Sequence, residues 1–147
     1  MNKIDLQTSP GFLVGRIAHR LRVLISKFID EAGIQVSAEE LQVLTALAQF
    51  DSKKSMGELA DQLGRDPTTL KRHLNGLVKS VLVNRSNSSE DGRVIEISIT
   101  EAGRTLVDST MPMTIALRER ALEGVSESDR KALGRILSQM MQNLADR

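Results

Sequence analysis

The strongest constraint on the fold is a helix stop followed at once by a helix start, at residues 64–67. Gly64 breaks a short amphipathic segment, and Asp66 with Pro67 begins the next one. An aspartate caps a helix amino terminus, and proline fits the first helical position, where a missing N–H costs nothing. Ser55 and Glu58 form a capping box that starts the preceding segment. The pattern predicts two short helices joined by a tight turn.

The second of these helices has two different faces. Its apolar residues recur at i, i+4, i+7 and i+8, which predicts one buried stripe: Leu70, Leu74, Leu77 and Val78. The opposite side carries hydroxyls, an amide and cations but no carboxylate: Thr68, Arg72, Asn75 and Lys79, flanked by Thr69 and Lys71. Such side chains suit phosphate oxygens and base edges. A solvated helix face with no ligand is the alternative interpretation.

Residues 82–100 predict a β-hairpin. Leu82 and Val83 start a short strand, and residues 84–93 contain no apolar side chain. Residues 95–99 then alternate between isoleucine and polar side chains, which is the period of a half-buried strand. The Asp-Gly pair at 91–92 is a turn signal within a longer polar loop. Two helices followed by such a hairpin form the pattern of a winged helix-turn-helix.

Positive charge concentrates in the same stretch. Between Arg65 and Arg93 there are six basic residues and three acidic ones, while the remainder of the chain has 14 basic and 16 acidic residues. The segment is therefore locally positive although the whole chain carries a net charge of only +1. A local excess of cations is the electrostatic pattern expected of a surface that binds phosphate.

This stretch resembles the DNA-binding lobe of the MarR (multiple antibiotic resistance regulator) family of transcription regulators. The likeness lies in GELADQLGRDPTTLKRHLNGLVK, in Asp91-Gly92-Arg93, and in the strand ISIT that leads into Glu101-Ala102-Gly103. The flanking helices extend the likeness to most of the chain. Two departures concern the end of the second helix: the family usually has Gly-Leu where this chain has Val81-Leu82, and Gly76 lies inside the helix. They leave that end open between Gly76 and Val81.

The expected architecture is mainly α with a small β-hairpin wing, in a single domain of residues 1–147. Residues 37–100 form the winged helix-turn-helix lobe, and residues 11–30 and 101–147 form a helical dimerisation region. These terminal helices are broadly apolar, so a homodimer buries them economically; the resemblance implies the same assembly. A monomeric helical subdomain is the alternative. Pro112 predicts a kink or a break near Met111.

The resemblance implies a sequence-specific regulator of transcription that binds double-stranded DNA at a pseudo-palindromic site and is a repressor released by a small-molecule effector. The expected DNA-binding residues are Thr68, Thr69, Lys71, Arg72, Asn75, Lys79, Arg85, Asp91 and Arg93. The helix from Pro67 enters the major groove, while Arg93 reaches the minor groove. The family's Asp-x-Arg pattern implies that Asp91 orients Arg93, and Arg85 contacts phosphate or braces the wing. The alternative is a winged-helix protein-interaction module without DNA binding.

The resemblance also implies a small anionic or aromatic effector. Arg16, His19 and Arg20 lie at i, i+3 and i+4, so one helix face presents them together. Pairing of these cations with acids such as Glu119 or Glu123 is the alternative.

Catalysis and metal binding have little support in the sequence. It contains no Cys, two His, no Gly-rich phosphate loop and no G-x-S-x-G motif. We therefore expect no enzymatic activity, no catalytic residue, no metal and no cofactor. No apolar run is long enough to span a membrane and no signal peptide begins the chain, which predicts a cytoplasmic protein.

Overall fold

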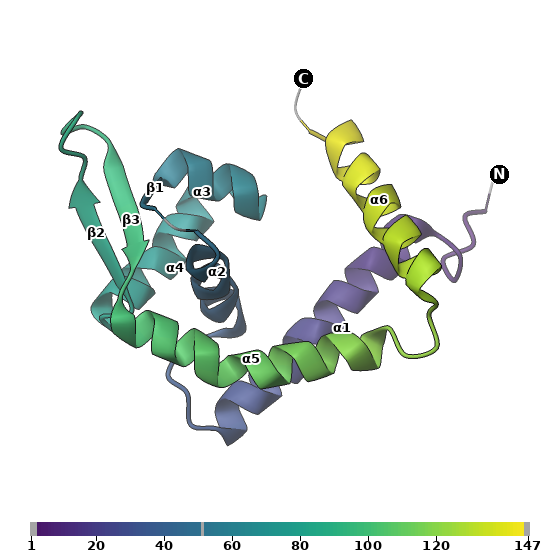
Figure 1. Cartoon of the computed structure of the whole chain (residues 1–147). Helices are drawn as coiled ribbons and strands as arrows, with labels where there is room; N and C mark the ends of the chain where they lie inside the picture. Colours follow the sequence, from purple (N-terminus) through teal and green to yellow (C-terminus); the bar gives the residue numbers. More distant parts are fainter. Residues whose placement is uncertain (1–2, 51, 146–147) are drawn as a thin grey trace. The chain divides into compact units, whose positions relative to one another are not determined.

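The computed structural model describes residues 3–50 and 52–145, which form six helices and three short strands (Figure 1). In chain order the elements are α1 (Pro10–Glu31), α2 (Ala38–Ala48), β1 (Lys54–Ser55), α3 (Met56–Leu63), α4 (Pro67–Lys79), β2 (Val83–Asn87), β3 (Ile95–Ile99), α5 (Glu101–Ala121) and α6 (Glu127–Asn143). The chain divides into two compact units, Met1–Thr110 and Met111–Arg147. The mainly α architecture with a small β wing is confirmed. None of the described helices is both long and apolar enough to cross a membrane.

The helices of the winged lobe begin where the sequence predicts. The hydroxyls of Ser37 and Ser55 each accept a hydrogen bond from the backbone N–H three residues on, at 3.1 and 3.2 Å. Asp66 caps α4 by accepting two backbone N–H groups, at 2.9 and 3.1 Å, and Pro67 occupies the first helical position. These caps satisfy N–H groups that a helix start otherwise leaves without partners.

Two helix boundaries differ from the sequence prediction. Helix α1 begins at Pro10, one residue before the predicted helical segment 11–30, because proline suits the first turn. A break near Met111 was one of two predicted consequences of Pro112, and it is wrong, because α5 continues on both sides of this proline. Proline removes one backbone donor there, and the remaining hydrogen bonds of the helix carry it across.

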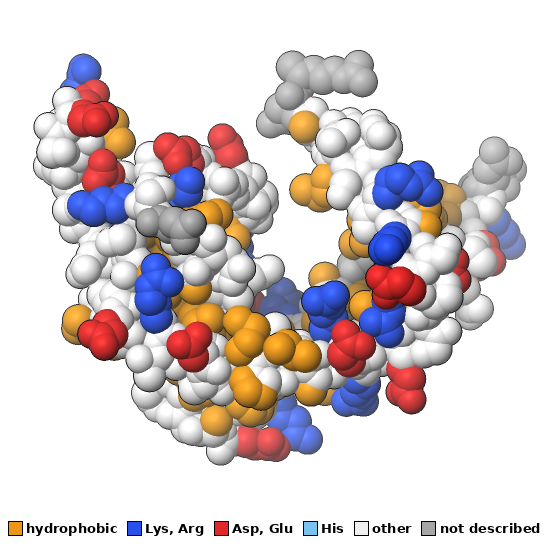
Figure 2. Space-filling view, in the orientation of Figure 1, with side chains coloured by type: hydrophobic (Ala, Val, Ile, Leu, Met, Phe, Trp, Pro, Cys, Tyr) orange, Lys and Arg blue, Asp and Glu red, His pale blue; other side chains and the backbone are white. Residues whose placement is uncertain are grey.

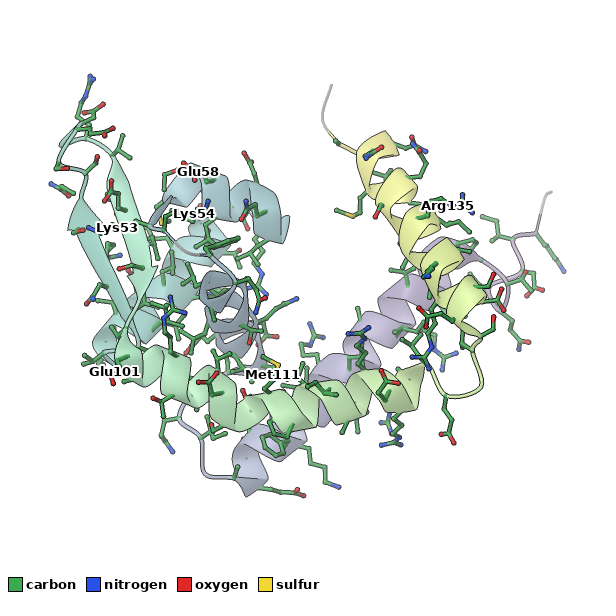
Figure 3. All side chains as sticks on the ribbon, in the orientation of Figure 1. Lys53, Lys54, Glu58, Glu101, Met111 and Arg135 are labelled. Atoms are coloured by element: carbon green, nitrogen blue, oxygen red, sulfur yellow. The ribbon has the colours of Figure 1, made fainter. Side chains whose placement is uncertain are left out.

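The three strands form an antiparallel sheet in the order β1-β3-β2. Strand β2 pairs with β3 so that Val83 lies opposite Ile99 and Asn87 lies opposite Ile95. The strand therefore extends to Asn87 within the polar segment that was predicted as hairpin loop. On the other edge of β3, β1 places Lys54 opposite Ile97. Near this short strand, Lys54 forms an ion pair with Glu58 at 3.9 Å (Figure 3).

The winged lobe encloses its own core. Its largest fully buried side chains come from α2, α3, α4, β2 and β3: Leu44, Leu59, Leu70, Leu74, Leu77, Ile97, Val43 and Val83. The leucine stripe predicted on the second helix is confirmed, with its three leucines wholly inaccessible. Since this stripe fixes the rotation of α4, the opposite side of the helix must face solvent.

Candidate nucleic-acid interface

The outer face of α4 carries the polar side chains that the sequence assigned to it. Five of the six predicted residues on this helix are exposed, and Thr69 is half-buried: Thr68, Lys71, Arg72, Asn75 and Lys79 are the exposed ones. No carboxylate interrupts this part of α4. The face therefore offers hydrogen-bond donors and positive charge over three helical turns, which is the chemistry that suits the edge of a DNA duplex.

The start of α4 is held by a single carboxylate. Asp66 accepts the hydroxyl of Thr69 in addition to two backbone N–H groups. The hydroxyl of Thr69 is the largest cause that lowers the pKa of Asp66, followed by the backbone N–H of the same residue. The carboxylate stays ionised and keeps the cap closed. The Thr69 hydroxyl proton is therefore donated within the cap.

The end of α4, left open by the sequence, lies at Lys79. Beyond the cap residue Ser80, two residues close the helix with a paired motif: Leu82 N–H donates to the Leu77 carbonyl and Val81 N–H donates to the Val78 carbonyl, each at 3.0 Å. This motif needs a left-handed residue, and Val81 adopts a φ of 61°. A β-branched residue is strained in that conformation, where the related family usually has glycine.

Gly76 lies inside α4 and does not end it. A Cβ atom at this position would lie 3.1 Å from Glu40 Oε1 and 3.3 Å from Glu40 Cδ. The missing side chain therefore lets the Glu40 side chain of α2 approach the backbone of α4. Close approach explains a glycine that local helix propensity disfavours.

A junction of three backbone segments fixes α4 relative to the hairpin and to the first turn of α5. The Thr100 hydroxyl donates to the Val81 carbonyl at 2.8 Å and accepts the Gly103 N–H at 3.0 Å. The Thr100 N–H donates to the Leu82 carbonyl at 3.1 Å. Gly103 makes this approach possible, because a Cβ atom there would lie 2.3 Å from the Leu82 oxygen. Thr100 thus caps α5, as predicted, and also holds the end of α4.

The wing tip carries an arginine paired with an aspartate. Arg93 donates from Nε and Nη2 to the two carboxylate oxygens of Asp91, at 3.2 and 3.4 Å, and its backbone N–H also donates to this carboxylate. The Arg93 side chain is 92% exposed. The Arg93 side-chain hydrogen bond is the largest cause that lowers the pKa of Asp91. Figure 2 shows basic and acidic side chains side by side at this tip, which projects beyond the helices of the lobe in Figure 1.

The family profile described as transcriptional regulator SarA/Rot matches residues 24–110, which include the whole winged lobe. The chain belongs to the SarA/Rot family of transcriptional regulators. It is therefore a DNA-binding regulator with a winged helix-turn-helix, and the interaction module without DNA binding is not supported.

Curated relatives of this SarA/Rot-family chain are also regulators. It is 28% identical over 114 residues to the uncharacterized HTH-type transcriptional regulator YdgJ of Bacillus subtilis (strain 168), covering 78% of the chain and 69% of YdgJ. It is 25% identical over 130 residues to the HTH-type transcriptional repressor IacR of Pseudomonas putida, covering 88% of the chain and 74% of IacR.

Solved structures, one of them of a MarR-family regulator, have the same fold as this chain. A MarR-family regulator from Silicibacter pomeroyi superposes with a TM-score of 0.84 at 24% identity, covering 99% of both chains. The S. aureus MepR–DNA complex gives 0.79 at 21% identity, covering 92% of this chain and 98% of MepR. Bordetella bronchiseptica BpsR, whose structure concerns regulation of its DNA binding by 6-hydroxynicotinic acid, superposes with a TM-score of 0.81 at 21% identity. The match covers 99% of this chain and 100% of BpsR.

One basic residue of this SarA/Rot-family chain, Arg65, makes its contacts within the winged lobe. Arg65, counted in the basic segment, donates to the Glu39 carbonyl at 3.2 Å and to the side chain of Gln42, and its Nη1 lies 3.1 Å from His73 Nδ1. Burial lowers the pKa of Arg65, while Glu39 opposes this shift. Arg65 therefore braces α2 and α4. Sequence reasoning missed this role because these contacts are distant along the chain.

The imidazole of His73 accepts a hydrogen bond from the same guanidinium. A guanidinium can only donate, so Nδ1 must be the accepting nitrogen, which places the ring proton on Nε2. Burial is the largest cause that lowers the pKa of His73, followed by the charges of Arg65 and Arg72. This histidine therefore packs within the lobe, between the turn before α4 and the outer face of that helix.

The three residues proposed for an effector lie together on α1. Arg16, His19 and Arg20 line an open hollow of about 740 Å³ that also includes Phe12 and other apolar side chains. The Arg16 guanidinium lies 5.9 Å from the centre of the Phe12 ring, and His19 Nδ1 accepts a hydrogen bond from Arg22 at 2.9 Å. Glu119, suggested as an alternative partner, forms an ion pair with Arg130 at 3.1 Å.

Proposed function

We propose that the chain binds a pseudo-palindromic site in double-stranded DNA as a homodimer, with α4 in the major groove and the wing in the adjacent minor groove. The observation that carries this proposal is the outer face of α4: it is exposed, free of carboxylates, and held in a fixed rotation by three buried leucines. The S. aureus MepR–DNA complex supports it, since MepR has the same fold. The protein acts by binding and not by catalysis.

Within this interface, the first turns of α4 read the bases. Arg72 projects from the exposed face, and a guanidinium there can grip O6 and N7 of guanine together. Thr68, Thr69 and Lys71 contact base edges or phosphates close to it, and Lys79 contacts the backbone further along. Arg93 inserts into the minor groove, where a narrow groove and its negative potential favour A·T-rich steps. Asp91 holds its guanidinium in place.

The homodimer is supported by apolar side chains that each unit leaves exposed. Phe12, Val14 and Ile17 of α1 and Leu133 and Ile136 of α6 are each 40–55% exposed. A second copy would cover such surfaces, with residues 11–30 and 101–147 as the dimerisation region; residues 146 and 147 lie outside the described part of the chain. Two equivalent lobes require half-sites about 10 bp apart, or a multiple of that spacing.

The regulator is a repressor that a small molecule releases from DNA. Two relationships support this part of the proposal: IacR is named a repressor, and BpsR binds DNA under the control of 6-hydroxynicotinic acid. A small anionic or aromatic effector would meet the cations Arg16, His19 and Arg20 beside an aromatic ring on α1. Footprinting with and without benzoate-like acids, and with Arg16→Ala and Arg20→Ala, tests this assignment.

The decisive experiment is a binding-site selection at two salt concentrations, followed by footprinting on the DNA that flanks the protein's own gene. Arg72→Ala should cost about 1–3 kcal/mol of binding and relax the preference at one base pair per half-site. Arg93→Ala should blunt an A·T preference at the outer flanks and lower the salt slope by about 1. Lys27→Ala on α1 is a matched control that removes a cation outside the interface and should change neither.

Two results would contradict the proposal. One is a wild-type protein that selects no sequence and shows no salt-dependent binding to duplex DNA. The other is an Arg72→Ala variant that keeps the full sequence preference while Arg93→Ala loses the central specificity, which would reverse the placement of helix and wing.

A further inference from the structure

The wing and the outer face of α4 are joined by a hydrogen bond between two residues that both belong to the proposed interface. Arg85 on β2 donates from Nη1 to Oδ1 of Asn75 on α4, and the two atoms are 2.6 Å apart. Ionised donors make shorter and stronger hydrogen bonds than neutral ones. Both side chains are exposed, so the contact lies at the surface where DNA would bind.

The register of the sheet explains why Arg85 points toward α4. Side chains alternate between the two faces of a strand, so Arg85 lies on the same face of β2 as Val83. Val83 is buried in the core, and Arg85 lies opposite the buried Ile97 of β3. The Arg85 side chain therefore starts on the helix side of the sheet and extends along it to Asn75. Asn84 and Ser86 occupy the outer face.

This contact determines how Asn75 can bind DNA. An asparagine amide has one accepting oxygen and one donating NH₂ group, and bidentate recognition of adenine uses both. A guanidinium carries only donors, so the atom that faces Arg85 must be the amide oxygen. Arg85 holds one of the two lone pairs of this oxygen, so the NH₂ group is the part of Asn75 that can bind DNA without competing with Arg85. It can meet acceptors such as N7 and O6 of guanine, O4 of thymine or a phosphate oxygen.

We propose that Arg85 is a positioning residue that acts through Asn75 and favours its NH₂ group as the part that binds DNA. Arg85 thereby disfavours the bidentate adenine contact that an unrestrained asparagine makes. The inference rests on the proposed function, because it requires the outer face of α4 to lie against DNA. Together, Arg85 and Asn75 would prefer hydrogen-bond acceptors on DNA, a preference that neither residue type would show alone.

A double-mutant cycle separates positioning from an independent phosphate contact. Arg85→Ala and Asn75→Ala should each weaken operator binding about tenfold, and the double variant should be no weaker than Asn75→Ala alone. The salt slope of the Asn75→Ala variant should not change when Arg85 is also removed. If the effects of the two single substitutions multiply in the double variant and removal of Arg85 lowers the salt slope by about 1, Arg85 binds phosphate by itself. This result would overturn the inference.

Binding-site selection provides a readout that a purely structural role would not move. In Arg85→Ala the freed amide oxygen should raise the preference for adenine at the base pair facing Asn75 by about tenfold over wild type. Arg85→Lys, which still places a donor near Asn75, should keep the wild-type selection. Thermal unfolding of each variant shows whether the lobe remains folded, and the Lys variant carries the test if Arg85→Ala does not fold.

The outcomes distinguish this inference from the proposed function. If Asn75→Ala relaxes one base pair, the acceptor is a base edge; if it weakens all sequences equally, the acceptor is a phosphate. Both results agree with an amide that only donates. A wild-type protein that selects adenine through Asn75 would overturn the inference while leaving DNA binding intact. A wild-type protein that selects no DNA at all would overturn the proposed function.

Discussion

Helices α4 and α6 have similar lengths, 13 and 17 residues, but their apolar side chains have opposite surroundings. Three leucines of α4 are wholly buried, whereas no described residue of α6 is buried. Figure 2 shows hydrophobic side chains exposed along α6. Both helices are amphipathic, so pattern alone does not separate them. The difference is that the lobe around α4 buries the apolar side chains of that helix, while the described residues leave those of α6 exposed.

The largest expected effect comes from a pair of matched truncations. Leu74→Ala removes a fully buried side chain from α4 and should lower the free energy of unfolding by about 2–5 kcal/mol. Ile136→Ala truncates a side chain of α6 that is 49% exposed and should mainly raise the dissociation constant of the dimer. Urea unfolding and sedimentation equilibrium over a range of protein concentrations measure the two quantities. The comparison breaks if Ile136→Ala destabilises the monomer as much as Leu74→Ala does.

The next effect tests the junction that closes the lobe. Gly103→Ala places a Cβ atom against the Leu82 carbonyl, 2.3 Å away before any relaxation, and should destabilise the lobe by about 1–3 kcal/mol. Gly57→Ala in α3 is the matched control, because its Cβ would meet only the Ser55 hydroxyl at 4.0 Å. This control should be neutral or stabilise by up to about 1 kcal/mol. Equal denaturant midpoints for the two variants would show that the backbone at Gly103 yields easily.

A smaller effect of opposite sign is expected at the end of α4. Val81→Gly should stabilise the lobe by about 1 kcal/mol, because glycine adopts a φ of 61° without the Cβ clash. Val81 is 66% exposed, so little buried apolar surface is lost. Val81→Ala retains a Cβ and should show much less of the gain. A drop in the midpoint of thermal unfolding for Val81→Gly would show that the valine side chain contributes more than its backbone strain costs.

The smallest expected effect is a pH dependence of the stability of the winged lobe. The pKa of His73 is lowered from its ordinary 6.5, so below that value the unfolded chain binds more protons than the folded one. The contribution is fully present above pH 6.5 and is lost as the pH falls toward the folded pKa. His73→Gln should flatten this part of the stability curve, measured by urea unfolding at about pH 7.5 and about pH 5.5. Greater stability of wild type at the lower pH would contradict the assignment.

Features that depend on neighbours in sequence were predictable. The caps Ser37, Ser55 and Asp66 each bind N–H groups within three residues, so their sequence pattern contains the interaction. The leucine stripe of α4 and the alternating β3 strand follow from helical and strand periods in the same way. These local features are sufficient to predict the fold class, the winged lobe and the outer face of α4.

Features that depend on distant partners were not predictable from these patterns. Strand β1 has two residues, too few for a period, and exists because β3 pairs with it. Arg65 looked like a free cation, but its guanidinium is directed inward by Glu39 and Gln42, more than 20 residues earlier. The contact between Arg85 and Asn75 was not predicted either, because it depends on the register of β2 on β3.

The Thr100 hydroxyl donates to the Val81 carbonyl and accepts the Gly103 N–H. It therefore connects the end of α4 to the first turn of α5. Turning the end of α4 without the first turn of α5 would break the hydrogen bond from the Thr100 hydroxyl to the Val81 carbonyl. The Thr100–Leu82 backbone bond would stretch as well. A displacement applied to the start of α5 must therefore carry the end of α4 with it. In the proposed complex with DNA, the angle of α4 in the major groove would therefore be set from outside that helix.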